Sequence, residues 1–336
     1  MKALVLKGIL GLLACLALPG LALGAPAVKV RSAISSLSAN HSHLWVADEQ
    51  GYFRKYGLEV PIVFISSGTT VIQSLLAGEL EVASMASDAA LSAVLEGAPI
   101  TIFATTAARN DFMFFVGKEI RTLGDLKGKR VGVTRFGAAS DGIALAIMAM
   151  AGLRPDRDVV RVQMGGLGEI LVGLRSGALA GGGLVPPFTV LARRLGLRAV
   201  YDFLEAPETD VFVVLVAKTA WLRDQRDVAL RYLRAASEGI HFILSQPDPA
   251  LYRQILTRRL RLVDQEMADE IAARMLKLYS HTRIPRTSLE GLRPPLGRIP
   301  HPRAKTADPT LFADNSLVEA LEREGFYQRL SSGGRP

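Results

Sequence analysis

A glycine-rich turn at residues 132–137, G-V-T-R-F-G, has the spacing of loops that hold phosphate groups. It follows a short apolar run and precedes a helical stretch, so strand, turn and helix stand in the order that presents backbone N–H groups to an anion. A triphosphate loop would continue with lysine and then serine or threonine, but the next residues are Ala138 and Ala139. The sequence therefore excludes a nucleoside triphosphate and predicts a simpler anion site in this turn.

The other reactive residues do not indicate catalysis or a metal centre. No G-x-S-x-G stretch supplies a hydrolase nucleophile, and no H-E-x-x-H stretch joins any of the five histidines. His41 and His43 are two residues apart, which points them in different directions on a helix. We therefore expect no catalytic residues, no metal and no cofactor, and a protein that holds a small molecule.

Short polar side chains gather in the loops that follow predicted strands. Ligands of open α/β sheets bind beyond the carboxyl ends of the strands, where backbone N–H groups and hydroxyls point inward. Each serine could instead be a helix cap, but their recurrence in several loops favours a cleft. The residues expected to bind a ligand in the first half are Ser35, Ser36, Asn40, His41, Ser66, Ser67, Gly68, Ser87 and Asp88.

The glycine-rich turn is expected to form the opposite wall of this cleft. Its backbone N–H groups would face an anionic group, and arginine side chains would add positive charge. Asp141 lies in the first helical turn and would repel an anion, so we expect it to point outward as a capping carboxylate. The residues expected to bind a ligand in this half are Arg109, Arg135, Phe136, Gly137, Ala138, Ala139 and Ser140.

Alternating strands and helices must position these loops. The pattern predicts strands at residues 28–34, 58–65, 81–85 and 99–106, with helices between them, and further strands at 130–134 and 158–163. Two similar stretches, L-L-A-G-E-L at 75–80 and L-R-S-G-A-L at 174–179, stand at the same place in each half. The sequence therefore predicts an α/β fold built on parallel sheet, in two related lobes.

The chain changes character after residue 210. A strand is expected at 210–217 and amphipathic helices at 223–245 and 251–278. Residues 284–302 are rich in proline and arginine and are expected to be a wrapping segment or a flexible loop. A capping box of Ser316 and Glu319 predicts the start of a final helix.

The N-terminus predicts export. Lysines precede an apolar stretch that ends in small residues, so residues 1–24 are expected to be a secretory signal peptide. Cys15, the only cysteine, lies in L-L-A-C, which resembles a lipoprotein cleavage box, so lipid anchoring is the alternative to a free periplasmic protein. The net charge is +8, but the basic residues are scattered and do not alternate with aromatics, so no nucleic-acid partner is expected.

Two motifs resemble those of a known family. Residues 47–60, A-D-E-Q-G-Y-F-R-K-Y-G-L-E-V, resemble the signature A-x-x-x-G-Y-F-x-K-x-G-L-x-V, and residues 123–133, L-G-D-L-K-G-K-R-V-G-V, resemble D-L-K-G-K-x-x-G-V. Over residues 28–245 the chain resembles periplasmic solute-binding proteins of ABC importers, of the nitrate/sulfonate/taurine type. It is similar also to thiamine-precursor binding proteins.

The resemblance implies a two-lobed periplasmic-binding-protein fold with a ligand cleft between the lobes. Two strands, at 100–106 and 211–217, would cross the hinge. Lobe one would comprise residues 25–106 and 211–330, lobe two residues 107–210, and residues 331–336 a disordered tail. The lobes would close around a small, anionic ligand, and the closed monomer would deliver it to an ABC permease in the membrane.

One departure from the family bears on the ligand. After residue 179 the family usually has Asp-Ala, but here Ala180 precedes three glycines, which makes the second wall more apolar. Pro186 and Phe188 therefore join the expected site. Phe64, Phe103 and Phe136 are expected either to add aromatic surface to the cleft with Phe188 or to pack in the core. The ligand could therefore be an aromatic or bulky organic anion as well as a small inorganic one.

Two other functions stay open. One is a ligand-sensing adaptor that docks on a membrane receptor, and the other is an enzyme on the same fold. Chorismate-derived dehydratases resemble the family but belong in the cytosol, against the signal peptide. Fungal thiamine-pyrimidine synthases carry a cysteine-rich motif that this chain lacks.

Overall fold

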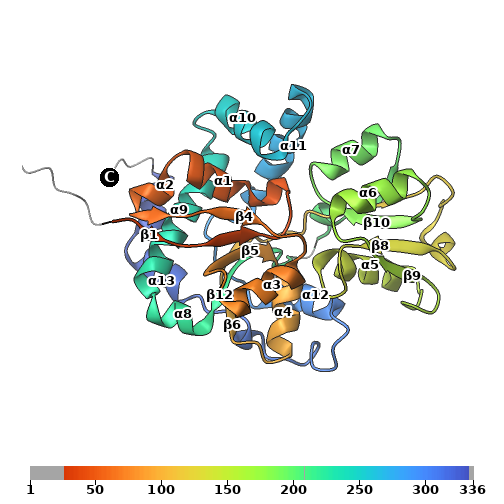
Figure 1. Cartoon of the computed structure of the whole chain (residues 1–336), viewed down its shortest axis with the longest axis horizontal. Coiled ribbons are helices and arrows are strands. Elements are labelled where there is room, and N and C mark those ends of the chain that lie inside the picture. The colour runs from red at the N-terminus through yellow and green to blue at the C-terminus, as the bar shows by residue number, and fades with distance from the viewer. Residues whose placement is uncertain (1–25, 208, 333–336) are drawn as a thin grey trace, which may run out of the picture.

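The computed structural model describes residues 26–207 and 209–332, so the expected signal peptide and Cys15 lie outside the described residues. Two five-stranded sheets with helices on their faces form two lobes side by side (Figure 1). We call them lobe one and lobe two. The strands of lobe one, in order across the sheet, are β4 (Ile62–Phe64), β2 (Ser32–Ile34), β5 (Val82–Ala86), β12 (Val213–Lys218) and β6 (Ile100–Ala107).

Lobe one is parallel on one side and antiparallel on the other. β2 pairs in parallel with β4 and β5, whereas β12 lies antiparallel between β5 and β6. The strands expected at 28–34 and 58–65 are each split, and the additional pieces β1 (Val28–Lys29) and β3 (Leu58–Glu59) pair with each other. Pro61, between β3 and β4, has no N–H group to donate to the sheet.

Lobe two repeats the plan around a strand made of glycines. β10 reads G-G-G-L, and a Cβ atom at Gly181 or Gly182 would lie 2.8 Å from Phe114 or 2.5 Å from Ile170. Only glycine lets these large side chains lie against both faces of the strand. The strands, in order across the sheet, are β11 (Arg198–Asp202), β7 (Met113–Val116), β10 (Gly181–Leu184), β8 (Arg130–Val133) and β9 (Val160–Gln163).

Helices cover both sheets, and most lie where the pattern predicted them. In lobe two they are η2 (Leu123–Leu126), α5 (Ala139–Met150), α6 (Leu167–Arg175), α7 (Phe188–Arg194) and η3 (Phe203–Glu205). In lobe one and the C-terminal region they are η1 (Ala39–His41), α1 (Ser42–Glu49), α2 (Tyr52–Lys55), α3 (Gly68–Ala77), α4 (Ser87–Leu95), α8 (Thr219–Asp224), α9 (Arg226–Ser245), α10 (Pro249–Leu260), α11 (Gln265–Ser280), η4 (Glu290–Leu292), α12 (Arg293–Arg298), η5 (Pro309–Leu311), α13 (Ser316–Arg323) and α14 (Phe326–Ser331).

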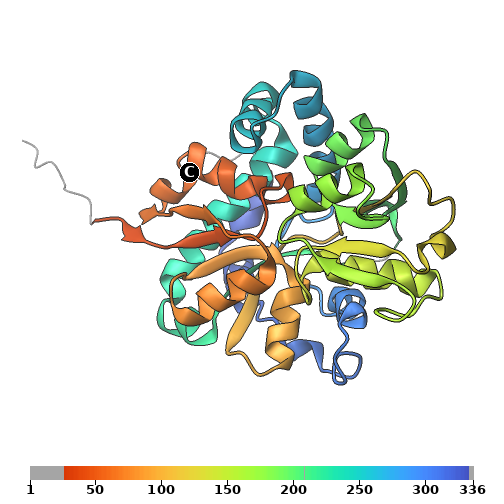
Figure 2. The same cartoon turned by 45° about the vertical axis from the view of Figure 1, so that its right-hand side comes forward.

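The C-terminal region is ordered and touches both lobes. Within the segment expected at 284–302, α12 packs on α4 of lobe one and on α5 of lobe two. It lies beside α4 and below α5 in two views (Figures 1 and 2). α13 starts at Ser316 as predicted, but the capping box does not form, because Asp314 accepts the Ser316 N–H at 2.8 Å and Glu319 pairs with Arg286. The expected tail begins at Ser331, which is still the last residue of α14.

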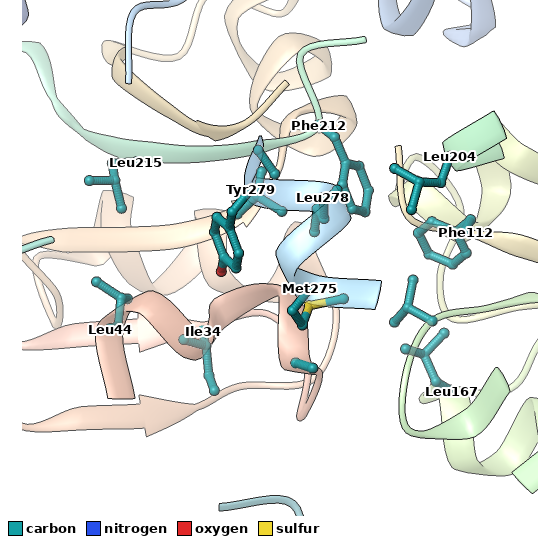
Figure 3. Packing of buried hydrophobic residues seen from close by; sticks show 14 of the residues in the cluster. Ile34, Leu44, Phe112, Leu167, Leu204, Phe212, Leu215, Met275, Leu278 and Tyr279 are labelled. Atoms are coloured by element: carbon teal, nitrogen blue, oxygen red, sulfur yellow. The ribbon is translucent and has the colours of Figure 1, made fainter. Parts of the chain in front are cut away.

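The hydrophobic core continues from one lobe into the other. Met275 and Leu278 of α11 lie between Leu44 on the lobe-one side and Phe112 on the lobe-two side (Figure 3). A second cluster fills the other face of the lobe-one sheet, under α3 and α4. The chain leaves the lobe-one sheet after β6 and re-enters it at β12, so these are the two strands that lead into the hinge. We keep residues 25–106 with 211–330, and 107–210, as the proposed division into lobes.

Candidate functional site

A cavity of about 460 Å³ lies between the lobes and is lined by residues from both. Its volume falls in the range of small-molecule sites, about 300–1,000 Å³. The expected residues that line it are Ser35, Ser36, Asn40, His41, Ser66, Ser67 and Gly68 from lobe one, and Arg135, Ala138, Ala139, Ser140 and Phe188 from lobe two.

The lobe-one wall comes from two loops at the same edge of the sheet. Residues 35–40 follow β2 and residues 66–68 follow β4, and these strands are parallel neighbours. The Ser67 N–H donates to the Ser35 carbonyl at 3.1 Å, which holds the two loops together. The carboxyl ends of parallel strands meet at one edge, and the predicted serines lie together for this reason.

His41 is a buried, neutral residue in this wall. Its Nδ1 lies 2.9 Å from Ser84 Oγ and its Nε2 lies 3.3 Å from Ser36 Oγ. Burial lowers the pKa of His41 to about 3. A base this weak is a poor acceptor of a serine proton at neutral pH, since a general base works best with a pKa near the operating pH. The contact between serine and histidine is therefore suited to orienting side chains rather than to nucleophilic catalysis.

Asn40 has hydrogen-bonding capacity left over. Its side chain lines the cavity, and the residue is only 3% exposed. In the described part of the chain, its buried Oδ1 has no hydrogen-bond partner. Buried polar atoms are nearly always paired, so an unpaired one at a cavity indicates a contact that a ligand completes.

The turn before α5 makes more internal hydrogen bonds than the sequence predicted. The Gly137 N–H donates to Asp141 Oδ2 at 2.9 Å, and Asp141 also pairs with Arg161 at 2.7 Å. Asp141 is buried and lies outside the cavity lining, so it caps the turn as expected but does not point to solvent. Gly137 is not part of the lining, and its N–H is not available to a ligand.

A second turn, residues 165–169, lines the cavity and was not among the expected site residues. It follows β9 and leads into α6, as residues 66–68 follow β4 and lead into α3. The repeat between the two halves of the sequence could have predicted this turn, because it stands at the same place as residues 66–68. Glu169 and Arg135 are the two formally charged residues of the lining, and both are exposed.

Two hydrogen bonds join the walls across the cleft. Ser66 Oγ donates to the Gly165 carbonyl at 2.7 Å, and the Ala39 N–H donates to the Pro186 carbonyl at 3.2 Å. Pro186 lies outside the cavity lining and contributes this contact instead. The structure is therefore a closed arrangement of the lobes.

Aromatic rings form much of the apolar lining. Phe64 and Phe188 contribute as expected, and Phe112 and Phe212, from the two hinge segments, were not anticipated. The rings of Phe112 and Phe212 meet edge to face with centroids 5.8 Å apart. The remaining expected rings lie elsewhere: Phe103 is fully buried in the core, and Phe136 is 47% exposed with the Arg161 guanidinium over its ring.

Three expected residues serve the hinge instead of the cavity lining. Ser87 donates to the Val211 carbonyl at 2.6 Å, and Asp88 pairs with Arg298 of α12. Arg109 donates to the Ala206 carbonyl. The sequence placed Ser87 and Asp88 after a strand, but α4 begins at Ser87 without an intervening loop. The Ser87 side chain is thereby directed to the Val211 carbonyl just before β12, and the Asp88 side chain to Arg298 of α12.

Residues 38–250 match the model of a protein family described as NMT1/THI5 like. The chain belongs to the NMT1/THI5-like family. This NMT1/THI5-like chain is 27% identical over 220 residues to the formylaminopyrimidine-binding protein of Halalkalibacterium halodurans, a match that covers 64% of the chain and 66% of that protein. It is 25% identical over 213 residues to the putative binding protein YtlA of Bacillus subtilis, covering 62% and 64%. The match thus spans just under two thirds of each relative's length.

Solved structures confirm the fold of the NMT1/THI5-like chain. A protein of Bordetella bronchiseptica superposes with a TM-score of 0.79 at 20% identity, covering 89% of this chain and 99% of that one. The nitrate-binding protein NrtA of Synechocystis gives 0.70 at 14% identity, covering 88% and 89%. The alkanesulfonate-binding protein SsuA of Xanthomonas axonopodis, bound to MOPS, gives 0.67 at 15%, covering 88% and 98%. The predicted two-lobed periplasmic-binding-protein fold and the family resemblance are both confirmed.

Two features are absent from the described residues 26–207 and 209–332 of the NMT1/THI5-like chain. These residues contain no cluster of three or more His, Cys, Asp or Glu side chains that could hold a metal ion. They also contain no helix that combines the length and apolarity needed to cross a membrane.

Proposed function

We propose that the chain is an extracytoplasmic solute-binding protein that captures a small anionic organic ligand between its lobes and delivers it to an ABC permease. The observation that carries this proposal is a cavity whose two walls belong to different lobes and are joined by the hydrogen bonds from Ser66 to Gly165 and from Ala39 to Pro186. A ligand that touches both walls favours the closed form over the open one. A permease that binds only the closed form then receives loaded protein.

The size and lining of the cavity favour an organic ligand over a bare inorganic oxyanion. About 460 Å³ leaves most of the space unfilled around an ion such as nitrate. Phe64, Phe112, Phe188 and Phe212 offer apolar contact to a ring or chain. The curated relative named for formylaminopyrimidine places pyrimidines among the ligands to test.

Binding without turnover is part of the proposal. His41 lacks the basicity that a serine nucleophile needs, because burial lowers its pKa to about 3. Both walls come from one chain, so a monomer completes the cavity. We further propose that the mature protein works in the periplasm after removal of residues 1–24.

The test is a thermal-shift screen of the purified mature chain against nitrate, alkanesulfonates, phosphonates, pyrimidines and aromatic carboxylates. We expect at least one organic compound to raise the melting temperature in a concentration-dependent way, since a ligand that binds only the folded state stabilises it. Mass spectrometry should recover that compound unchanged after long incubation. A product formed over many turnovers would make the chain an enzyme.

Delivery needs a separate measurement. The mature chain, with and without the compound found in the screen, is added to liposomes that contain a candidate ABC permease from the same organism. We expect the loaded protein to stimulate ATP hydrolysis more than the empty protein. A loaded protein that binds a receptor kinase and leaves the permease inactive would favour the sensing function instead.

A further inference from the structure

Four helices begin at the cavity, since the first residues of α3, α5, α6 and α7 all line it. The short helix α7 has its first N–H groups occupied, because Phe188 and Thr189 donate to the Val185 carbonyl at 2.9 and 3.4 Å. The other three begin at Gly68 (α3), Ala139 (α5) and Leu167 (α6). The first N–H groups of a helix have no acceptor within the helix, and the helix dipole favours negative charge there. An anionic group could therefore bind at any of three helix N-termini.

Two of these ends already carry a negative charge of their own. Asp141, in the first turn of α5, accepts the Gly137 N–H at 2.9 Å. Glu169, in the first turn of α6, folds back over its own helix end, since a Cβ atom at Gly166 would lie 2.4 Å from Glu169 Oε2. Each carboxylate partly satisfies the helix end on which it lies. Asp141 is also paired with Arg161 at 2.7 Å, whereas the exposed carboxylate of Glu169 repels a second anion.

The third end, α3, carries no acidic residue in its first turn. In the described part of the chain, no acceptor is assigned to the N–H groups of Gly68, Thr69 or Thr70. The hydroxyls of Ser67 and Thr69 lie 3.1 Å apart and bond to each other, so they add no charge. This helix end is the uncompensated one.

Asn40 gives independent evidence for a ligand at the same wall. Its residue is 3% exposed, it lines the cavity, and its Oδ1 has no partner among the described residues. The loop that carries Asn40 is held to the start of α3 through the bond from the Ser67 N–H to the Ser35 carbonyl. A half-turn of the carboxamide exchanges Oδ1 and Nδ2, and in that orientation the NH₂ group of Asn40 is the donor to an anion at this wall.

We propose that the cavity takes an aromatic carboxylate whose carboxylate group lies at the N-terminus of α3, beside the carboxamide of Asn40. The proposal rests on the solute-binding function proposed above. The ring of the ligand lies against Phe188 and Phe212, and Arg135 faces it from the opposite wall. Lobe one thus binds the anionic group, and Phe188 of lobe two closes over the ring from the side opposite Asn40's lobe.

The first test compares benzoate with benzamide, its neutral isostere, by isothermal titration calorimetry on the mature chain. We expect benzoate to bind about ten-fold more tightly or better, because one uncompensated helix end favours the charged form by roughly this factor. Equal affinities, or binding of neither probe, would overturn the proposal. Neither result would overturn the proposed solute-binding function, because binding of any other compound in the thermal-shift screen would still support it.

The second test moves a carboxylate onto the helix end. Thr69→Asp places one in the first turn of α3, and Thr69→Asn is the matched neutral variant. The Thr69 side chain faces the turn before α5, since its Cγ2 lies 3.8 Å from a Cβ atom added at Gly137. We expect Thr69→Asp to weaken benzoate binding about ten-fold relative to Thr69→Asn. Thermal unfolding should show that it folds, because aspartate is favourable in a first helical turn.

Two further variants locate the anion. Asn40→Ala should weaken benzoate more than benzamide, because a hydrogen bond from the Asn40 NH₂ group to a carboxylate is stronger than one to the neutral amide carbonyl. Ala139→Asp places the same charge at the N-terminus of α5, which is the competing location for the anion. If Ala139→Asp loses benzoate while Thr69→Asp binds it like Thr69→Asn, the anion lies at α5 and the proposal is wrong.

Discussion

Burial of His41 in the cavity wall makes the stability of the fold depend on pH. Burial lowers the pKa of His41 to about 3, and burial and the charge of His41 lower that of His43 well below its usual value. An unfolded chain takes up a proton near pH 6.5, whereas the folded chain does not, so this stability is present above pH 6.5 and is lost as the pH falls toward 3.

We therefore expect the free energy of unfolding to drop by about 2–3 kcal/mol per buried histidine between pH 7 and pH 4.5. Urea unfolding at the two pH values measures it. His41→Gln, whose side chain cannot take up a proton, should show a smaller drop than the parent. An unchanged drop in His41→Gln would mean that His41 is protonated in the folded state.

Ser66 is predicted to act on closure more than on the ligand itself. Its hydroxyl donates to Gly165 across the cleft at 2.7 Å, a bond that exists only when the lobes are closed. A neutral hydrogen bond contributes about 0.5–1.5 kcal/mol, so Ser66→Ala should weaken ligand binding about two- to ten-fold. The melting temperature of the ligand-free protein should hardly change.

The matched control is Ser245→Ala, whose hydroxyl donates to the His241 carbonyl at 2.8 Å within α9. It loses a similar bond but none between lobes, so calorimetry should give the parent affinity. Parent affinity in Ser66→Ala as well would show that the bond to Gly165 contributes nothing to closure.

At the scale of elements, α1 and α9 pack against each other through a glycine. A Cβ atom at Gly239 would lie 2.0 Å from the His43 carbonyl oxygen, so any side chain must push the helices apart. We expect Gly239→Ala to lower the free energy of unfolding by about 1–3 kcal/mol or more, as overpacking does. Urea unfolding measures it.

Gly297→Ala, in α12, is the control, because a Cβ atom there meets nothing within 4 Å. It should leave stability unchanged or raise it by up to about 1 kcal/mol. Equal stability of Gly239→Ala and the parent would mean that α1 and α9 can separate at no cost.

The elements that the sequence predicted are those with an apolar pattern of their own. The strand expected at 99–106 is β6, and the helix expected between the strands at 58–65 and 81–85 is α3. β10 was not predictable, because three glycines carry no strand pattern, and its conformation depends on pairing with β7 and β8.

The same distinction holds for the cavity. Ser35 and Ser66 follow from the rule that loops at the strand ends meet at one edge of the sheet. Phe112 and Phe212 do not, because they belong to hinge segments whose position depends on how the two lobes lie together. Asp88 was misplaced because its partner, Arg298, is distant in the sequence.

At the scale of the whole molecule, charged pairs join the lobes along one side of the cleft. α11 of lobe one faces lobe two near α7 (Figure 1), and Arg274 lies 2.8 Å from Asp202. Further pairs are Arg193 with Glu270, Arg194 with Asp264 and Lys277 with Glu205. Most of these side chains are partly exposed, so salt screens their attraction.

We therefore expect added NaCl to shift the ligand-free protein toward the open form. Small-angle X-ray scattering at 0.05 M and 0.5 M NaCl should show a larger radius of gyration at high salt. Arg194→Gln should be more open than the parent already at low salt, whereas Arg223→Gln, which loses a pair with Asp224 inside lobe one, should not. A radius that depends on neither salt nor Arg194 would mean that these pairs do not bias closure.

The position of β12 between β5 and β6 has a consequence for the order in which the chain folds. Before residues 213–218 are available, β6 has no neighbour in its sheet, whereas the strands of lobe two, within residues 113–202, are contiguous. Pairings between distant residues form slowly, because the intervening chain must first be brought together. Lobe two should therefore gain protection from hydrogen exchange first during refolding. Until β12 has paired, lobe one should remain an incomplete sheet that a chaperone or a protease can still recognise.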